Sequence, residues 1–334
     1  MRLSELLPIP AQADNVISGL ALDSRHIQPG YVFLALQGHK THGEHYIQIA
    51  LERGAQAILK EATTAELTWL NHHIPCISVP QLSQKVGHLA AHFYGYPAKQ
   101  LRVIGVTGTN GKTSTTHFIA QLLPRCGLIG TLGYGLYGAL NPGFHTTPDA
   151  LQLQALLAQF QAQKISHVVM EVSSHALAQG RVNAIDFEVA VFTNLTRDHL
   201  DYHSSMSAYG QAKQKLFTTP GLKTAIINQD DAFGRQLCTQ LPTSVVALTY
   251  GLQTTADVYA HIHTCDAQGY QVQVHTPWGS SQIQIPLIGY FNLSNVLAAL
   301  TVLLQWDLPL AELAPQVSKL NSLPGRMHCL GQHP

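Results

Sequence analysis

Residues 106–118 form a glycine-rich segment, VTGTNGKTSTTHF, whose residue types suit phosphate binding. Backbone N–H groups of such a turn point at an anion, Lys112 adds a positive charge, and the Thr113 hydroxyl is of the type that binds Mg²⁺. The usual G-x-x-x-x-G-K-[ST] pattern requires a glycine at position 106, which holds Val106. Gly108 instead creates a tighter G-x-x-G-K-T, so the segment predicts a phosphate site of another type. The alternative interpretation is an ordinary tight turn with a solvated lysine.

Two ionisable side chains follow buried strands farther along the chain. Glu171 comes at the end of the apolar run HVVMEV, and His199 comes shortly after the run FEVAVFTNL. Ligands bind outside the carboxyl ends of strands in open α/β sheets. A carboxylate, an imidazole and the Thr113 hydroxyl can converge there on Mg²⁺, with waters and phosphate oxygens completing the coordination. The alternative for His199 is a helix-capping or hydrogen-bonded core histidine.

A third group of side chains suits a substrate rich in carboxylates and amides. Ser173, Gln179 and Arg181 follow the same HVVMEV strand, and Thr146 and Thr147 come from a separate loop. An arginine can hold a carboxylate through two parallel hydrogen bonds. Without further information, T-T-P is equally typical of a loop that enters a helix.

The elements that must position these residues fall into two regions. Residues 1–97 have the pattern of a small mixed α/β unit, and Pro97 closes its last helix, which makes a domain boundary there plausible. The expected strands are residues 32–38, 55–60 and 75–80, and the expected helices are residues 46–54 and 82–95.

From Leu101 the pattern changes to strand, loop and helix in alternation. The expected strands are residues 101–108, 167–174, 187–195 and 223–228, and the expected helices are residues 113–123, 150–163, 230–241 and 292–306. Continuous β-branched runs between helices indicate a parallel sheet covered on both faces. Residues 245–288 alternate with period two, which predicts an antiparallel patch at one edge. The predicted fold class is α/β, with a small mixed N-terminal domain and a central P-loop-type parallel-sheet ATPase domain.

Composition excludes several classes of protein. Charged residues make up 11% of the 334 residues and the formal net charge is zero, which argues against a nucleic-acid-binding surface. No long apolar run and no secretion signal occur, so no membrane span is expected. The cysteines lack C-x-x-C spacing, which argues against a zinc ribbon and suits a reducing compartment. They are Cys76, Cys126, Cys238, Cys265 and Cys329. We expect a cytoplasmic protein of unknown oligomeric state.

Several segments together resemble the Mur ligases, the ATP-dependent amide-forming enzymes of peptidoglycan synthesis. T-G-T-N-G-K-T after a strand resembles their ATP loop, which also occurs in folylpolyglutamate synthases and cyanophycin synthetases. Four further segments resemble the MurE branch, the UDP-N-acetylmuramoyl-tripeptide synthetases. They are LDSR at 22–25, the threonine pair before Pro148, MEVSSHAL at 170–177 and NLTRDHLDYH at 194–203. The resemblance covers residues 15–327 in the order of the family.

The resemblance implies roles for the phosphate loop and the ionisable residues. ATP would be bound by Gly108, Thr109, Asn110, Gly111, Lys112, Thr113, Ser114 and Asn292, and Mg²⁺ by Thr113, Glu171, His199 and Lys213. Lys112 and Lys213 would be the catalytic residues, with Lys213 carbamylated. Without the resemblance, Lys213 would be taken for a solvent-facing helix lysine, and Lys215 is the competing assignment. Asn292 and Asn295 resemble the adenine-side motif, and they also suit a cap of the apolar helix there.

The resemblance also implies an acceptor substrate, UDP-MurNAc-dipeptide. Leu22, Ser24, His39, Lys40 and Thr41 match positions that hold the UDP portion, although by themselves they indicate only a cap and a solvated loop. The muramoyl-dipeptide would contact Thr146, Thr147, Ser173, Gln179 and Arg181. His145 stands where the family often has asparagine, so that contact stays open.

The implied reaction is ATP-dependent addition of the third stem-peptide residue, diaminopimelate or lysine, to UDP-MurNAc-L-Ala-D-Glu through an acyl phosphate. The implied organisation is a UDP-sugar-binding domain at 1–97, an ATP-binding domain at 98–323 and a linker at 324–334 that contains Arg326. A third domain, which binds the incoming amino acid, would begin where the chain stops. We therefore expect a form that binds ATP and the UDP-sugar but ligates poorly. The alternatives are a non-catalytic binding module and a related Mur or folylpolyglutamate-type ligase.

Overall fold

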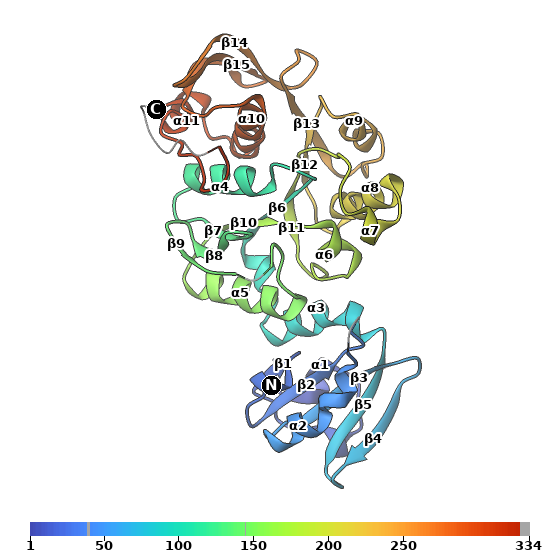
Figure 1. The fold of residues 1–334 in the computed structure, drawn as a ribbon. Coiled ribbons are helices and arrows are strands. Elements are labelled where there is room, and N and C mark those ends of the chain that lie inside the picture. Colours follow the sequence, from blue (N-terminus) through green and yellow to red (C-terminus); the bar gives the residue numbers. More distant parts are fainter. Residues whose placement is uncertain (39–40, 144, 328–334) are drawn as a thin grey trace. The chain divides into compact units, whose positions relative to one another are not determined.

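The computed structural model describes residues 1–38, 41–143 and 145–327. The chain divides into two compact units, which can be followed along the ribbon in Figure 1. Unit 1 consists of Met1–Ala98, Pro148–Gln159 and Gln179–Ile185, and unit 2 consists of Lys99–Thr147, Phe160–Ala178 and Asp186–Pro334. Whether these units fold as independent domains with the predicted limits stays a prediction.

Unit 1 is built on a five-stranded sheet in the order β1-β2-β3-β5-β4. The strands are β1 (Gly19–Ala21), β2 (Tyr31–Ala35), β3 (Ala57–Ala62), β4 (Glu66–Leu70) and β5 (Ile74–Pro80). The first four in spatial order pair in parallel, and β4 pairs antiparallel with β5 at the edge. The sequence predicted β2, β3 and β5. It did not predict β4, a five-residue edge strand that is largely exposed.

Three helices accompany the sheet of unit 1: α1 (Leu3–Leu6), α2 (Ile47–Glu52) and α3 (Leu82–Phe93). In α3 the apolar residues Leu82, Val86 and Leu89 recur at helical spacing and face the core. They are buried in one cluster with Leu34 and Leu59 of the sheet. The predicted helices at 46–54 and 82–95 are therefore confirmed, with ends shifted by a few residues.

Unit 2 contains an eleven-stranded sheet in the order β16-β15-β14-β13-β12-β11-β6-β10-β7-β8-β9. Its strands are β6 (Arg102–Thr107), β7 (Gly127–Gly130), β8 (Gly133–Leu136), β9 (Ala139–Asn141), β10 (His167–Glu171), β11 (Phe187–Phe192), β12 (Thr224–Asn228), β13 (Val246–Gly251), β14 (Val258–Asp266), β15 (Gly269–Thr276) and β16 (Gly279–Ile285). In the spatial order of the sheet, the neighbouring strands from β14 across β13, β12, β11, β6 and β10 to β7 all pair in parallel. The predicted α/β class with a parallel central sheet is confirmed.

The antiparallel part of this sheet differs in two ways from the prediction. β13 pairs in parallel with β12, so the antiparallel patch begins only at β14 and not at residue 245. A second antiparallel edge, β7-β8-β9, lies at the other end of the sheet. Its strands are only three or four residues long, and two of them contain two glycines each, so they carry almost no periodic signal.

The helices of unit 2 are α4 (Lys112–Leu122), α6 (Ser174–Ala178), α7 (Leu200–His203), α8 (Met206–Gln214), α9 (Ala232–Cys238), α10 (Tyr290–Leu304) and α11 (Leu310–Val317). The residues of α5 (Ala150–Ala162) are divided between the two units. α10 is apolar nearly all round and packs against α4, as Figure 1 shows. The sequence did not predict α11, which begins after Pro309 and contains Pro315.

The strand order places β6 between β11 and β10, the strands on which the candidate polar residues depend. All four neighbouring strands follow β6 in the chain, but in the sheet β10 and β7 lie on one side of β6, and β11 and β12 lie on the other. Such a reversal of direction in a parallel sheet opens a crevice at the carboxyl ends of the strands. Among the described residues, no helix is long and apolar enough to cross a membrane.

Candidate active site

The phosphate-loop candidate connects β6 to α4, as predicted. Gly108 has φ +151° and Gly111 has φ +86°, a region of backbone conformation that favours glycine. A Cβ on Gly108 would collide with the Thr193 hydroxyl, and one on Gly111 would collide with Asn295 Oδ1. Both glycines are therefore required by conformation and by the close approach of neighbouring side chains.

Residues after β11 brace this loop from the side. The Asn110 N–H donates to Asn194 Oδ1 at 3.0 Å, and Asn194 Nδ2 donates back to the Asn110 carbonyl at 3.1 Å. The Thr109 hydroxyl donates to the Thr196 carbonyl at 3.2 Å. These bonds join segments more than 80 residues apart in the sequence, so the loop has a defined shape.

The Nζ atoms of two lysines donate to a single carbonyl oxygen of the loop. Lys112 Nζ donates to the carbonyls of Gly108 and Thr109 at 2.9 and 2.8 Å. Lys213 Nζ, from α8, donates to the Gly108 carbonyl at 2.7 Å and lies 4.3 Å from the centre of the Tyr209 ring. Burial lowers the pKa of Lys112, and burial together with the nearby Lys112 charge lowers the pKa of Lys213 to about 6.

The position of Lys213 settles how its helix faces the protein. The side chain is 1% exposed, although a lysine at that spacing would ordinarily face solvent. Lys215, the competing lysine, is exposed. The ordinary expectation for Lys213 is therefore wrong, and the structure brings it to the phosphate loop.

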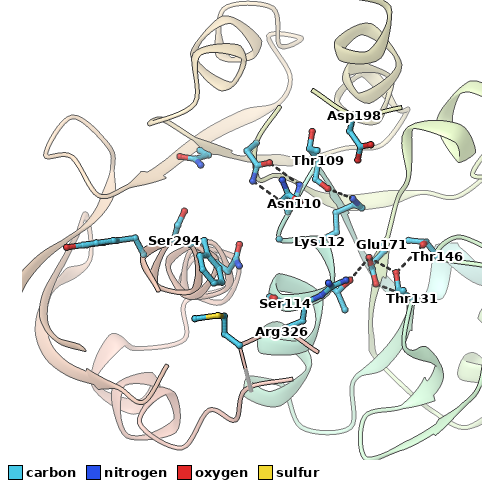
Figure 2. Close-up of a pocket in the computed structure, with 18 of the residues that line it drawn as sticks. Thr109, Asn110, Lys112, Ser114, Thr131, Thr146, Glu171, Asp198, Ser294 and Arg326 are labelled. Atoms are coloured by element: carbon cyan, nitrogen blue, oxygen red, sulfur yellow. Dashed lines mark hydrogen bonds between the residues drawn. The ribbon is translucent and has the colours of Figure 1, made fainter. Parts of the chain in front are cut away.

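Glu171, at the end of β10, is the buried carboxylate beside the loop. It accepts hydrogen bonds from Thr113 Oγ1 at 3.0 Å, from the Thr131 N–H at 2.7 Å and from Thr131 Oγ1 at 3.2 Å (Figure 2). The residue is 1% exposed, and burial raises the pKa of its carboxyl. A Cβ on Gly130 would collide with this carboxylate, which shows how closely β7 approaches it.

His199 precedes α7 in a left-handed backbone conformation, with φ +50°. Its Nε2 lies 3.5 Å from Asp198 Oδ2, and its ring centre lies 4.9 Å from that of His175. His199 and Glu171 line the same pocket. Within the described part of the chain, no three His, Cys, Asp or Glu side chains are grouped as metal ligands. A metal ion held here would therefore need hydroxyl, water or phosphate oxygens as well.

The threonine pair lies against the end of β10. Thr147 Oγ1 donates to the Glu171 carbonyl at 2.9 Å and accepts from the Ser173 N–H at 3.1 Å. The hydroxyl oxygens of Thr146 and Thr131 are 3.0 Å apart. The structure therefore brings the predicted residues Thr146, Thr147 and Ser173 to the Glu171 carboxylate region.

The remaining predicted substrate residues belong to unit 1. Arg181 donates to Gln179 Oε1 from Nε at 2.9 Å and from Nη2 at 2.6 Å. Ser24 is buried in a short turn capped by Asp23, Leu22 is half-buried and Thr41 is exposed. His39 and Lys40 lie outside the described residues.

The phosphate loop, Glu171, His199 and Thr146, all in unit 2, line one pocket of that unit, with a volume of about 930 Å³. Its lining includes most of the predicted loop residues and several that the sequence did not single out (Figure 2). The predicted ones are Thr109, Asn110, Gly111, Lys112, Thr113, Ser114, Thr146, Glu171 and His199. The others include Thr131, Asn194, Asp198, Asn228, Tyr290, Phe291 and Ser294. The lining also contains Asn295, which was predicted for the adenine side, and Arg326, which was predicted in the linker.

Of the two asparagines predicted for the adenine side, the structure places one in the pocket lining. Asn292 is 2% exposed and its Nδ2 donates to the Ile288 carbonyl at 2.8 Å, so it binds the start of its own helix. Asn295 lines the pocket instead. Tyr290 and Phe291, 61% and 53% exposed, line it too. The overlooked signal in the sequence was this pair of adjacent aromatic residues, which are the first two residues of α10.

Comparison with known proteins agrees with a nucleotide-dependent ligase fold. Residues 16–94 match the catalytic domain of the Mur ligase family, and residues 106–303 match the Mur ligase middle domain. The chain belongs to the Mur ligase family.

Similar proteins place it in one branch of that family. The UDP-N-acetylmuramoyl-L-alanyl-D-glutamate–2,6-diaminopimelate ligase of Alkalilimnicola ehrlichii is 45% identical over 94% of this chain and 66% of its own length. The ligase of the same name from Pseudomonas aeruginosa is 46% identical over 99% of this chain and 68% of its own length. A solved structure of such a ligase superposes with a TM-score of 0.87 at 36% identity, covering 100% of this chain and 69% of that one. The resemblance to the tripeptide synthetase branch is confirmed, and the chain spans about two thirds of the length of these relatives.

Proposed function

We propose that this protein acts as an ATP-dependent ligase that adds diaminopimelate to UDP-MurNAc-L-Ala-D-Glu. The observation that carries the proposal is the convergence of Lys112, Lys213, Thr113 and Glu171 around the loop at the end of β6. Relatives 42–46% identical to this chain carry the name of that diaminopimelate ligase, which favours this acceptor over a folate.

ATP is proposed to occupy the pocket of unit 2. The loop N–H groups and the N-terminus of α4 would face its phosphates, since both favour negative charge. Tyr290 and Phe291 would stack on the adenine, and Asn295 would hydrogen-bond its edge. Arg326 lines the same pocket and adds a positive charge close to Lys112.

The chemistry of the donor set fits Mg²⁺. Glu171 is a buried carboxylate hydrogen-bonded to a Thr113 hydroxyl, and hard cations prefer such oxygen ligands beside phosphate. We propose Thr113, Glu171 and His199 as the residues that hold it, and Lys213, if carbamylated, as a ligand of a second ion. When bound, Mg²⁺ neutralises charge on the phosphate oxygens.

The proposed reaction has two steps. The glutamyl carboxylate of the acceptor attacks the γ-phosphorus of ATP, the bond to the β-γ bridging oxygen breaks, and ADP leaves. The amine of diaminopimelate then attacks the carbonyl of the acyl phosphate, loses a proton, and inorganic phosphate leaves. Lys112 stabilises charge on the transferred group, so the chain contributes positioning and electrostatics more than proton transfer. Thr146, Thr147 and Ser173 are proposed to orient the acceptor carboxylate.

Binding of a fluorescent ATP analogue to the 334-residue chain tests the nucleotide site. Lys112→Ala is expected to weaken binding at least tenfold, about 1.4 kcal/mol, because it removes a charge beside the phosphates. Lys215→Ala is the matched control, since Lys215 is exposed, and it should bind as the wild type does. Equal binding by Lys112→Ala and wild type would remove the assignment.

The acceptor is tested by trapping the acyl phosphate. Wild type with ATP and UDP-MurNAc-L-Ala-D-Glu should form a hydroxamate when hydroxylamine is present, whereas a folate in its place should form none. Hydroxamate formation with the folate alone would assign the chain to another ligase class. ATP binding without hydroxamate from either acceptor would favour a binding module.

A further inference from the structure

Thr131 connects the proposed metal carboxylate to the proposed acceptor loop. It follows β7 directly, and its backbone N–H and its hydroxyl both reach the Glu171 carboxylate, at 2.7 and 3.2 Å. Its hydroxyl oxygen is also 3.0 Å from that of Thr146 (Figure 2). All three residues line the same pocket.

The directions of these hydrogen bonds follow from the chemistry of the groups. A threonine hydroxyl has one hydrogen to donate, and an ionised carboxylate only accepts. Thr131 therefore donates to Glu171 Oε2, and Thr146 must be the donor in its contact with Thr131. The result is a chain of hydrogen bonds from Thr146 through Thr131 to Glu171, in which each bond polarises the next.

The opposite side of the carboxylate is held by a different element. Thr113 Oγ1, in the first turn of α4, donates to the same Oε2 atom at 3.0 Å. Glu171 is therefore oriented both from the phosphate loop and from the Thr146 loop. The Thr147 hydroxyl holds the Glu171 carbonyl at 2.9 Å, so the Thr146 loop contacts this residue at its backbone as well.

We propose that Thr131 is a positioning residue that orients Glu171 for metal binding and couples it to Thr146. The inference rests on the proposed function, because it requires Glu171 to be a metal ligand. It has two consequences. Loss of the Thr131 hydroxyl weakens metal binding, and loss of the Thr146 hydroxyl weakens metal binding only through Thr131. The Thr146 oxygen also keeps its lone pairs for a ligand N–H or O–H.

The test measures the dissociation constant of Mn²⁺ from the full chain by electron paramagnetic resonance, with a non-hydrolysable ATP analogue bound. Thr131→Val removes the hydroxyl and keeps both the shape and the N–H bond to Glu171. It is expected to weaken Mn²⁺ binding about tenfold, the lower end of effects seen when a partner of a metal ligand is lost. Thr131→Ser restores the hydroxyl and should stay within about twofold of wild type.

A double-mutant cycle distinguishes coupling from a general structural effect. Thr146→Val should weaken Mn²⁺ binding although Thr146 does not touch the carboxylate, and adding it to Thr131→Val should change nothing further. Thermal unfolding of each variant checks the fold. If Thr131→Val does not fold, the Mn²⁺ affinity of Thr146→Val still tests the coupling.

Unchanged Mn²⁺ affinity in Thr131→Val, or full additivity of the two substitutions, would overturn the inference while leaving the proposed function intact. If wild type does not bind Mn²⁺ together with the nucleotide, or if Lys112→Ala binds the nucleotide as wild type does, both the inference and the proposed function are overturned.

Discussion

Replacement of Lys213 by methionine tests the electrostatics of the site most directly. The Lys213 side chain is 1% exposed and lies beside Lys112, and its pKa is lowered from 10.5 to about 6, so its amine is mostly neutral at pH 7 in the folded protein. Methionine keeps most of the side-chain length and removes the amine. The Gly108 carbonyl still accepts from Lys112 at 2.9 Å, so the substitution leaves no buried acceptor without a partner.

The expected effect on stability follows from proton linkage. Between about pH 6 and pH 10.5 the unfolded chain binds a proton at Lys213 that the folded chain does not. The Lys213 contribution to the free energy of unfolding therefore rises with pH in this window, by about 1.4 kcal/mol per pH unit. From pH 7.0 to 8.5 this increase in the free energy of unfolding amounts to about 2 kcal/mol, and Lys213→Met should not show it.

Urea denaturation of wild type and Lys213→Met at pH 7.0 and 8.5 measures this difference. Buffers are freed of CO2 so that the amine is not carbamylated during the experiment. Lys215→Met serves as the control, because Lys215 is exposed and should keep the wild-type slope. An identical pH dependence in wild type and Lys213→Met would refute the view that Lys213 is neutral in the folded protein.

Two other residues give predictions of the same kind. Phe291→Ala should weaken binding of the ATP analogue by about 1–3 kcal/mol, because it removes the proposed stacking on the adenine. Trp278→Ala, at an exposed site outside the pocket, is the control and should bind as the wild type does. Equal titration curves for Phe291→Ala and wild type would exclude stacking. His117 is buried, neither ring nitrogen has a hydrogen-bond partner among the residues that the structure describes, and burial lowers its pKa from 6.5 to about 4. The unfolded chain binds the extra proton below pH 6.5, so acidification from pH 7 to 5 should destabilise wild type relative to His117→Phe by about 2 kcal/mol. Denaturation at both pH values checks this, with the exposed His261→Asn as control; parallel losses in wild type and His117→Phe would contradict it.

The local elements around the site could be predicted from the sequence because their signals are local. The run before Gly108 reads as a buried strand, and the helix begins directly after Gly111, so the phosphate loop was recognisable without its other partners. Glu171 was predictable at a strand end for the same reason. Apolar runs and helix limits depend on residues that are adjacent in the chain, so a single sequence is enough to predict them.

The depth of Lys213 was not predictable from local pattern. Its helix, α8, has only a weak apolar face, and nothing in the neighbouring residues shows that Nζ reaches a carbonyl 105 residues earlier. The resemblance to the Mur ligases supplied that position. Thr131 was overlooked altogether, because it lies in a glycine-rich turn and becomes important only where β7 passes beside β10.

The amino-acid sequence by itself determined the strand, loop and helix that form the phosphate loop, and the residue types that suit a phosphate and a cation. Tertiary structure alone decided which of those residues meet. The order of parallel strands places Thr113, Thr131 and Glu171 together, and it makes Asn295 rather than Asn292 line the pocket. The physical reason is that strand order and burial are set by packing between distant segments, whereas sequence patterns report only the conformation of adjacent residues.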